Sequence, residues 1–321
     1  MAGEPPESFQ EIVGESPALK DLLGRAAIVA HTNSTVLITG ETGTGKEQLA
    51  RMIHATSGRK DHSFIKANCA VIPAGGLESE LFGHERGAFP GAISQKIGRL
   101  ELADNGTLLL DEVEEIPLEL QPRVLRVLQS QDFERMGGIK TLRVDVRLIA
   151  VTNHDLTIAV EADEFRADLF YRLHVFPLHL PALRDRREDI PLLIRHFVEK
   201  CAARFHKRID IIPEEVIAAM MQWRWPGNIR ELENFVERSV IRSEGNRLSP
   251  PLEELREDVL RPSESDATLR TAEREQIIEV LRQTRGALSG PAGAAARLGL
   301  RRSTLQSKMQ QLGISRTDYL R

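Results

Sequence analysis

An apolar strand, a glycine-rich turn and a helix follow one another between residues 35 and 54, and this order constrains the fold more than any other feature. The strand is TVLIT, Thr35–Thr39, and helical periodicity covers Gln48–His54. The turn reads GETGTGKE, which is the spacing of a phosphate-binding loop. Its backbone N–H groups and the N-terminus of the helix can cradle phosphate oxygens. The loop residues are Gly40, Glu41, Thr42, Gly43, Thr44, Gly45, Lys46 and Glu47.

The alternative is a glycine-rich turn that arises by chance, which the full spacing and the strand–helix context disfavour. One position departs from the generic loop. Glu47 follows the lysine, where a Ser or Thr usually ligates Mg²⁺. A carboxylate can bind the ion through water, so Glu47 is a candidate metal residue.

A second apolar strand, Thr107–Leu110, ends in two acids, the first of them 65 residues after Lys46. In a parallel sheet this strand end lies beside the phosphate-binding loop. Asp111 is expected to hold Mg²⁺ through water, and Glu112 to orient or deprotonate an attacking water. An apolar run ending in Asp-Glu is common by itself, but at this place it favours ATP hydrolysis over passive nucleotide binding. ATP and Mg²⁺ are the expected cofactors.

Strand and helix signals alternate up to about residue 180, which is typical of an α/β fold with a mainly parallel sheet covered on both faces. A third strand signal is Val146–Thr152, and Leu118–Ser130 has helical periodicity. Beyond Pro181 the strand signals fade. Helices are predicted there over 190–205, 213–223 and 228–243.

These signals divide the chain into five segments. They are an N-terminal tail over 1–8, an α/β domain over 9–180, a helical domain over 181–248, an acidic linker over 249–267 and a helical module over 268–321. The linker holds three prolines and six acids, so we expect a solvated segment with one helical turn in its middle.

Charge is distributed unevenly along the chain. The net charge is −4, yet residues 268–321 carry 10 Lys and Arg against 4 Asp and Glu. A basic C-terminal segment in an otherwise acidic chain indicates that this segment binds a polyanion.

Composition excludes several classes of protein. Hydrophobic residues make up 41%, enough to bury a core, and no run approaches the ~18 apolar residues of a membrane-spanning helix. The N-terminus MAGEPPESF does not look like a secretory signal. Two cysteines cannot form a disulfide framework, and the nine histidines show no metal-ligand spacing. We expect a cytoplasmic protein without membrane contact and without a metal other than Mg²⁺.

The basic tail has a helix-turn-helix pattern. A first helix is predicted over 272–284 and a short alanine-rich helix over 293–298, followed by a turn at Gly299 and a last helix over 303–312. The residues expected to face inward are Ile277, Ile278, Leu281, Leu305, Met309 and Leu312.

The outer face of the last helix is suited to contacts with phosphates and base edges in a major groove of DNA. A three-helix protein-interaction domain is the alternative, which the positive charge of the tail disfavours. The candidate DNA-binding residues are Arg301, Arg302, Ser303, Thr304, Gln306, Ser307 and Lys308.

A hexapeptide between the two nucleotide motifs, Gly87-Ala88-Phe89-Pro90-Gly91-Ala92, resembles the GAFTGA loop of the sigma-54-dependent transcriptional activators, which are bacterial enhancer-binding proteins of the AAA+ class. The match extends through ESELFGHERGAF, GTLLLDE, FERMGG, FRADLFYRL and WPGNIRELEN, and the tail resembles a Fis-type DNA-binding module. It covers nearly the whole chain, and the motifs are specific as a set. The resemblance implies a AAA+ ATPase domain, a helical lid and a helix-turn-helix module.

The resemblance also implies roles for residues near the γ-phosphate. Asn68, in KANCA, matches the switch asparagine that holds the catalytic Glu112 when the γ-phosphate is absent. Thr152 and Asn153 match the sensor of the γ-phosphate at the end of a strand.

Three arginines match residues that contact the nucleotide in the family. Arg166 and Arg172 correspond to arginines offered to the ATP of the neighbouring subunit, and Arg230 to a second sensor in the helical domain. Ile12 and Val13 resemble the contact on the adenine side. Without the motifs, a surface salt bridge is the alternative for any one of these arginines.

Pro90 departs from the family pattern, which has Thr at this position. By resemblance, the tip of the loop touches sigma-54 and moves with the nucleotide state. Proline removes a hydroxyl and a backbone N–H and restricts φ to about −65°. ATP hydrolysis is expected, whereas its coupling to sigma-54 through this loop is an open question. The alternative is a tolerant surface turn in which the change is silent.

The expected function is that of an ATP-hydrolysing, DNA-binding transcription activator that remodels the sigma-54 RNA polymerase holoenzyme from DNA sites upstream of a promoter. Arginines that act in trans require a closed homo-oligomeric ring, and the family implies a hexamer. A nucleotide-switched DNA-binding regulator that does not remodel sigma-54 is the first alternative, and a AAA+ chaperone or protease subunit the second, which the basic tail disfavours. The chain begins almost directly at the ATPase domain, so we expect either a shortened chain or regulation by a partner in trans.

Overall fold

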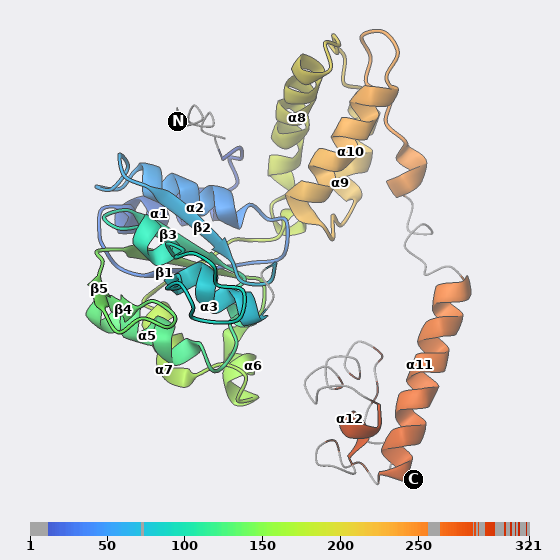
Figure 1. Ribbon diagram of the computed structural model, residues 1–321. Helices are drawn as coiled ribbons and strands as arrows, with labels where there is room; N and C mark the ends of the chain where they lie inside the picture. Colours follow the sequence, from blue (N-terminus) through green and yellow to red (C-terminus); the bar gives the residue numbers. More distant parts are fainter. Residues whose placement is uncertain are drawn as a thin grey trace. The chain divides into compact units, whose positions relative to one another are not determined.

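Five parallel strands form the central sheet, in the order β2-β3-β6-β1-β7 (Figure 1). They are β1 (Val36–Thr39), β2 (Phe64–Asn68), β3 (Thr107–Asp111), β6 (Arg147–Thr152) and β7 (Phe176–His179). The computed structural model describes residues 12–71, 74–255 and 264–284, and then 286, 288, 293–298, 305, 309, 312, 314 and 319. The chain divides into two units, Met1–Leu252 and Glu253–Arg321.

Helices cover both faces of the sheet, because its strands are apolar on both sides. One face packs against α1 (Pro17–Ala30) and α2 (Lys46–Ala55). The opposite face packs against α3 (Ala74–Phe82), α5 (Gln121–Ser130) and α7 (Ala167–Leu173). The short elements of the domain are α4 (Arg99–Leu102), η1 (Val113–Glu115), β4 (Asp132–Glu134), β5 (Thr141–Arg143) and α6 (Leu156–Glu161).

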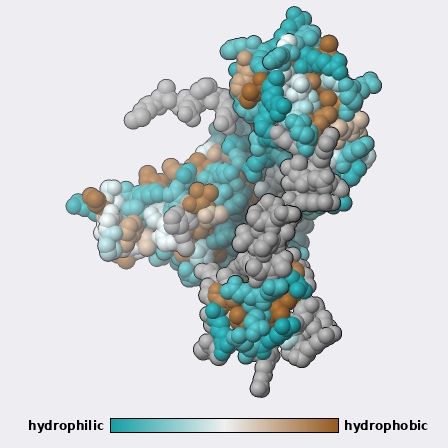
Figure 2. Space-filling view, turned by 90° about the vertical axis from the view of Figure 1, so that its right-hand side faces the viewer, coloured by the Kyte–Doolittle hydropathy of each residue, from teal (hydrophilic) through white to brown (hydrophobic). Residues whose placement is uncertain are grey.

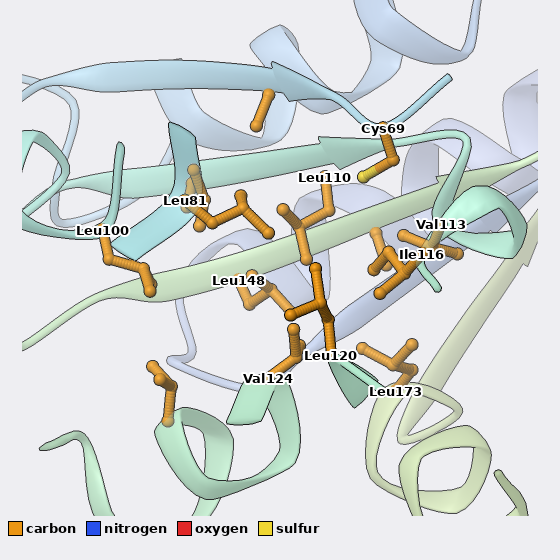
Figure 3. Packing of buried hydrophobic residues seen from close by; sticks show 14 of the residues in the cluster. Cys69, Leu81, Leu100, Leu110, Val113, Ile116, Leu120, Val124, Leu148 and Leu173 are labelled. Carbon is orange, nitrogen blue, oxygen red and sulfur yellow. The ribbon is translucent and has the colours of Figure 1, made fainter. Parts of the chain in front are cut away.

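Strand β3 shows how the two cores are separated. Leu109 packs into the cluster with α1 and α2, whereas Leu108 and Leu110 pack into the other cluster, because successive side chains of a strand point to opposite faces. Figure 3 shows Leu110 and Leu148 of neighbouring strands above Leu120 and Val124. Burial on both faces fixes the carboxyl end of β3 and the two acids that follow Leu110.

The predicted strands 35–39, 107–110 and 146–152 correspond to β1, β3 and β6 within one residue, and the α/β fold is confirmed. Strands β2 and β7 were not predicted. The helix predicted from Leu118 begins only at Gln121, because Pro122 occupies its first turn and the preceding residues form a turn in which the N–H of Leu120 donates to Pro117.

A small helical domain follows the sheet. It contains η2 (Leu183–Asp185), η3 (Arg187–Asp189), α8 (Ile190–Arg204), α9 (Glu214–Gln222) and α10 (Asn228–Arg242). Trp225 is fully buried in it, with its indole N–H donating to the carbonyl of Met220 and its ring edge-on to Phe235. This anchor fixes the turn that leads into α10.

The second unit contains α11 (Glu264–Gln283) and α12 (Ala294–Arg297), and η4 (Leu252–Leu255) lies at the boundary between the units. Ile277, Ile278, Leu281 and Leu305 are buried together, as predicted, and Met309 and Leu312 are partly buried against them. Helix α11 begins inside the segment predicted as a linker.

The early start of α11 is compatible with its sequence, because Glu264–Gln283 contains neither Gly nor Pro, the residues that interrupt helices. The candidate DNA-binding residues Arg301, Arg302, Ser303, Thr304, Gln306, Ser307 and Lys308 lie outside the described residues.

Hydrophilic residues cover most of the face drawn in Figure 2, and apolar residues form only small groups on it. Among the residues that the structure describes, no helix combines the length and the apolar character that crossing a membrane requires.

Candidate nucleotide-binding site

The glycine-rich loop joins the carboxyl end of β1 to the N-terminus of α2, which begins at Lys46. Gly43 and Gly45 have φ angles of 80° and 103°, in the left-handed region that glycine tolerates. A Cβ at Gly43 would lie 2.3 Å from the carbonyl oxygen of Gly227, so this glycine also permits close contact with the helical domain. The Lys46 ammonium donates to the carbonyls of Gly40 and Glu41, at 2.7 and 2.9 Å. Burial lowers the pKa of Lys46, although Asp111 opposes the shift.

A pocket opens over this loop and is walled by both domains of the first unit. Of the candidate residues, it is lined by Ile12, Val13, Thr42, Gly43, Thr44, Gly45, Lys46, Glu47, Asp111, Glu112, Asn153 and Arg230. Helices α8 and α10 contribute further side chains, among them His196, Phe197 and Lys200. The other candidates of the described ATPase domain lie outside the lining: Gly40, Glu41, Asn68, Thr152, Arg166 and Arg172. A pocket with a phosphate-binding loop and an apolar end at Ile12 and Val13 fits a nucleotide.

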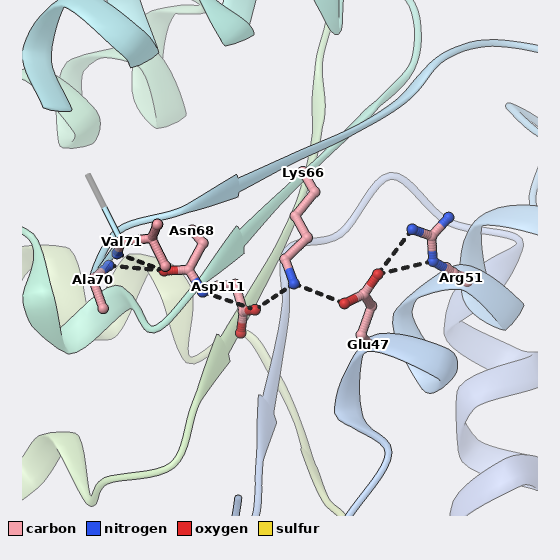
Figure 4. A network of polar contacts seen from close by, with 7 residues as sticks. All are labelled: Glu47, Arg51, Lys66, Asn68, Ala70, Val71 and Asp111. Atoms are coloured by element: carbon pink, nitrogen blue, oxygen red, sulfur yellow. Dashed lines mark hydrogen bonds and ion pairs between the residues drawn. The ribbon is translucent and has the colours of Figure 1, made fainter. Parts of the chain in front are cut away.

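Two carboxylates and an ammonium meet beside the loop (Figure 4). Lys66 on β2 donates to Glu47 Oε2 at 2.7 Å and contacts Asp111 Oδ2 at 2.8 Å. Burial by itself raises the pKa of Glu47, but hydrogen bonds from Lys66 and Arg51 outweigh it and the pKa is lowered. The two carboxylates assigned to Mg²⁺ therefore share a cation in this structure, and their oxygens are the donors that Mg²⁺ prefers.

Glu112 follows Asp111 with a backbone φ of 58°, a left-handed conformation that is uncommon for a residue with a side chain. Its side chain lines the pocket, at the start of η1. Backbone strain of this kind is retained only where the surroundings over-determine it, and it is concentrated at functional sites.

The structure places Asn68 against Asp111 and not against Glu112, in contrast to the contact that the resemblance implies. The Asn68 amide donates to Asp111 Oδ2 at 3.5 Å, and its oxygen accepts from the N–H groups of Ala70 and Val71. The reason is the register of the sheet, which pairs Asn68 with Asp111. In the described part of the chain, Asn68 makes no hydrogen bond to Glu112.

Asn153 lies at the carboxyl end of β6, where it contacts the glycine-rich loop. Its amide donates to Thr42 Oγ1 at 3.1 Å, and its backbone N–H donates to Glu114 at 3.3 Å. The Asn153 oxygen and the second oxygen of Glu114 are buried without a partner among the described residues. Thr152 is fully buried and donates to the carbonyl of His154, so its hydroxyl supports the strand end.

The glycine-rich loop is clasped to the helical domain through Glu41. Arg184 donates to both oxygens of Glu41, and Asn228 Nδ2 donates to Oε2 at 3.1 Å. Asn228 is fully buried and also accepts from the N–H of Leu183. The N–H of Ile229 donates to the Gly43 carbonyl at 2.9 Å, so the start of α10 rests directly on the loop. A change in the loop is therefore transmitted to the helix that carries Arg230.

Glu41→Gln is expected to destabilise the fold by about 1 kcal/mol at neutral pH, because the clasp is half exposed and solvent screens it. Hydrogen bonds from Arg184 lower the pKa of Glu41 to about 2 from an ordinary 4.5. A lowered pKa stabilises the folded state above pH 4.5, and this contribution is lost as the pH falls towards 2. Thermal unfolding at several pH values should show the two proteins converging as the pH falls below 4.5. A stability difference that stays constant over this range would contradict the assignment.

Arg166 is the N-cap residue of α7 and Arg172 lies in its last turn, both exposed at the surface of the domain. Arg166 pairs with Asp168 at 2.8 Å, and Arg172 donates to the carbonyl of Leu128. Neither residue lines the pocket of its own chain.

The hexapeptide Gly87–Ala92 forms a turn in which the N–H of Ala92 donates to Phe89 at 3.0 Å. Pro90 and Gly91 are its two central residues, and Gly91 has a φ of 103°. This is the pattern of a turn with Pro first and Gly second, in which no N–H is needed from the first residue. The ring of Phe89 packs edge-on against His84 at 5.0 Å. Proline therefore fits this conformation of the loop and stabilises it.

Known families match most of this architecture, between residues 12 and 312. Residues 12–179 match the Sigma-54 interaction domain, 184–272 the AAA+ ATPase lid domain, and 268–312 the family described as Bacterial regulatory protein, Fis family. The chain belongs to the sigma-54-dependent transcriptional activators.

Two curated relatives of this sigma-54-dependent activator come from Escherichia coli K12. It is 52% identical to the DNA-binding transcriptional activator HyfR, over 97% of this chain and 48% of the relative. It is 54% identical to the formate hydrogenlyase transcriptional activator FhlA, over 97% of this chain and 46% of the relative. The chain thus spans about half the length of these relatives. The stretch GPAGAAARLGLRRSTL predicted a resemblance to the formate hydrogenlyase transcriptional activator, and the identity over 97% of this chain confirms that resemblance.

A solved structure supports the fold over almost the whole chain. The crystal structure of NtrX from Brucella abortus in complex with ATP is 38% identical, with a TM-score of 0.69 over 95% of this chain and 69% of that one. That NtrX structure contains ATP, and nucleotide binding is consistent with the pocket above the loop of this chain.

Among the site residues that sequence reasoning did not find are Lys66, Glu114, Arg184 and Asn228. Lys66 could have been found, since it lies two residues before Asn68 and alternation puts both on one side of a strand. Asn228 stands inside the quoted motif WPGNIRELEN. Glu114 and Arg184 have no local pattern that separates them from surface charges.

Proposed function

We propose that this chain is an ATP-hydrolysing, DNA-binding transcription activator that remodels sigma-54 RNA polymerase at promoters. One observation carries the proposal. The phosphate-binding loop, Asp111 and Glu112 line a single pocket, within the residues that match the Sigma-54 interaction domain.

The pocket contains the groups that hydrolysis needs. Backbone N–H groups of the loop and Lys46 bind phosphate oxygens. Asp111 and Glu47 are positioned to hold Mg²⁺, which neutralises phosphate charge when bound. Glu112 orients a water molecule and accepts its proton. Asn153 senses the γ-phosphate, a role that its hydrogen bond to Thr42 of the loop supports.

A ring of subunits completes the site. Arg166 and Arg172 are exposed and lie outside the pocket of their own chain, which supports a role at the nucleotide of a neighbour. Contacts between unlike surfaces of a single protein close into a ring, and the family favours a hexamer. We place this ring in the cytoplasm, where its DNA sites and the polymerase are found.

The C-terminal module supplies the DNA contact. Its net positive charge and its match to the Fis family support binding to sites upstream of a promoter. The name of HyfR describes that relative as DNA-binding. Arg301, Arg302, Ser303, Thr304, Gln306, Ser307 and Lys308 remain the proposed contacts.

A second candidate function follows from Pro90. The turn around Pro90 is pre-organised, and the ring of Phe89, which is 36% exposed, packs edge-on against His84. A loop held in this conformation grips sigma-54 poorly. The chain would then be a nucleotide-switched regulator that hydrolyses ATP without remodelling the polymerase.

Pro90→Thr decides between these two functions. Threonine restores a hydroxyl and an N–H at the loop tip and releases φ. If the loop is restrained, transcription from a sigma-54 promoter rises severalfold while the ATPase rate changes by less than about twofold, because the loop holds none of the nucleotide-contacting residues. The measurement is both activities on the same pair of proteins. Equal activation by the parent and the variant would show that the loop works with proline and would favour the first function.

A further inference from the structure

The ammonium of Lys66 lies between the two carboxylates to which we assign the metal. It is 2.7 Å from Glu47 Oε2 and 2.8 Å from Asp111 Oδ2. Figure 4 shows the three side chains in a row, with Arg51 on the far oxygen of Glu47 and Asn68 beside Asp111. The chain thereby supplies its own cation at the place where a divalent ion is expected.

The three residues come from different elements and meet only in the folded protein. Lys66 is on β2, Glu47 in the first turn of α2 and Asp111 at the end of β3. The side chain of Asp111 is 18% exposed, and those of Lys66 and Glu47 are 33% and 32% exposed. The bridge is therefore partly shielded from solvent, unlike most surface ion pairs.

An ammonium and a divalent ion make different demands on these carboxylates. Without a cation, Glu47 and Asp111 would face each other as like charges, and desolvation would add to their repulsion. An ammonium ion relieves this repulsion through hydrogen bonds. A divalent ion relieves it more strongly but requires the same oxygens, so the two cations compete.

We infer that Lys66 is a positioning residue that acts as a tethered cation: it holds Glu47 and Asp111 in place before the nucleotide arrives and releases Asp111 when Mg²⁺ binds with the nucleotide. The inference rests on the proposed ATPase function. By this inference Lys66 sets the Mg²⁺ concentration that the site requires, whereas Lys46 binds the phosphates.

The same step bears on Asn68. Lys66 and Asn68 both reach Asp111 Oδ2 from β2, at 2.8 and 3.5 Å. With a divalent ion bound to Asp111, both contacts would be lost together. Asn68 would then be free to take a new partner, and Glu112, the residue that follows β3, is a neighbouring acceptor. Binding of a divalent ion is in this way coupled to the contacts that Asn68 on β2 makes.

Lys66→Met tests the inference, because Met keeps the length of the side chain and removes its charge. Thermal unfolding is followed at saturating ADP while Mg²⁺ is titrated. The Mg²⁺ concentration at half-maximal stabilisation should fall about tenfold in the variant, since losing a partly shielded ion pair of roughly 1.4 kcal/mol corresponds to that factor. Without Mg²⁺, Lys66→Met should unfold at a lower temperature than the parent, and Mg²⁺ with ADP should remove the difference.

Two further variants test whether the effect of Lys66→Met comes from the loss of the bridge between the carboxylates or from the loss of any positive charge nearby. Arg51→Met removes a positive charge that contacts Glu47 but not Asp111, and should move the Mg²⁺ midpoint less than twofold. Lys66→Arg keeps the charge and should keep the midpoint near that of the parent. Equal midpoints for the parent and Lys66→Met, or equal shifts for Lys66→Met and Arg51→Met, would overturn the inference.

A fluorescent ADP analogue distinguishes failure of this inference from failure of the proposed function. If the parent binds the analogue with Mg²⁺ and Lys66→Met has an unchanged Mg²⁺ requirement, only the role of Lys66 is wrong. If the parent binds no nucleotide at any Mg²⁺ concentration, the proposed ATPase function is wrong as well.

Discussion

Glu112→Gln is expected to bind ATP as the parent does and to lose turnover by about 10²–10⁴-fold, the usual contribution of a general base. Glutamine keeps the size of the side chain and its place in the pocket but cannot accept a proton. Lys46→Ala should instead lose ATP binding, because the ammonium that contacts the β- and γ-phosphates is gone. Nucleotide affinity and phosphate release, measured on each variant, separate the two roles.

Glu115→Gln is the matched control, since Glu115 is an exposed glutamate in the same short helix, η1. It should retain turnover within about twofold of the parent, as surface substitutions usually do. If Glu112→Gln turned over ATP at the rate of the parent, Glu112 would not be the base.

Arg172→Ala is expected to reduce ATP turnover by about 10³–10⁵-fold, the effect of removing an arginine finger. The residue lies outside its own pocket, so the effect should arise at the nucleotide of the neighbouring subunit. Mixing inactive Arg172→Ala protein with inactive Lys46→Ala protein should then restore part of the activity. In the mixed ring, some junctions combine an intact arginine with an intact phosphate-binding loop.

If the ATPase activity depends on contacts between subunits, it should also depend on protein concentration, which provides a control for this experiment. The ATPase rate of the parent should rise more than linearly with protein concentration, because the ring forms by mass action. Arg208→Ala, at a side chain that is 86% exposed, should leave the rate unchanged. Mixed rings that form but stay inactive would show either that Arg172 does not act in trans or that a ring needs every junction intact.

Prediction from the sequence succeeded where the signal is local. The glycine-rich loop, the strand ending in Asp111 and Glu112, and helix α8 are each contained in a short run of residues, so period and spacing were sufficient. The inward-facing residues of the tail, such as Ile277 and Leu281, were found for the same reason.

Two strands of the central sheet escaped prediction because their local signal is weak. Strand β7 contains Pro177, and proline is unusual within a sheet because it has no backbone N–H. In the described sheet β7 is an edge strand beside β1, so an N–H that would point away from β1 is not needed there. Strand β2 contains Lys66 and Asn68 and is only partly buried, so it lacks the continuous apolar run of β1 and β3. Its polar residues belong to the site.

The class of fold, the phosphate-binding loop and the two acids follow from local sequence, since each depends on neighbours along the chain. The groups that these residues contact became known only from the folded structure. The bridge from Lys66 to Glu47 and Asp111 and the clasp from Glu41 to Asn228 join segments that are distant in sequence. Such contacts depend on strand register and on the packing of one domain against another. A shift of one residue along β2 would turn Lys66 and Asn68 to the other face of the sheet, and no local pattern encodes that choice.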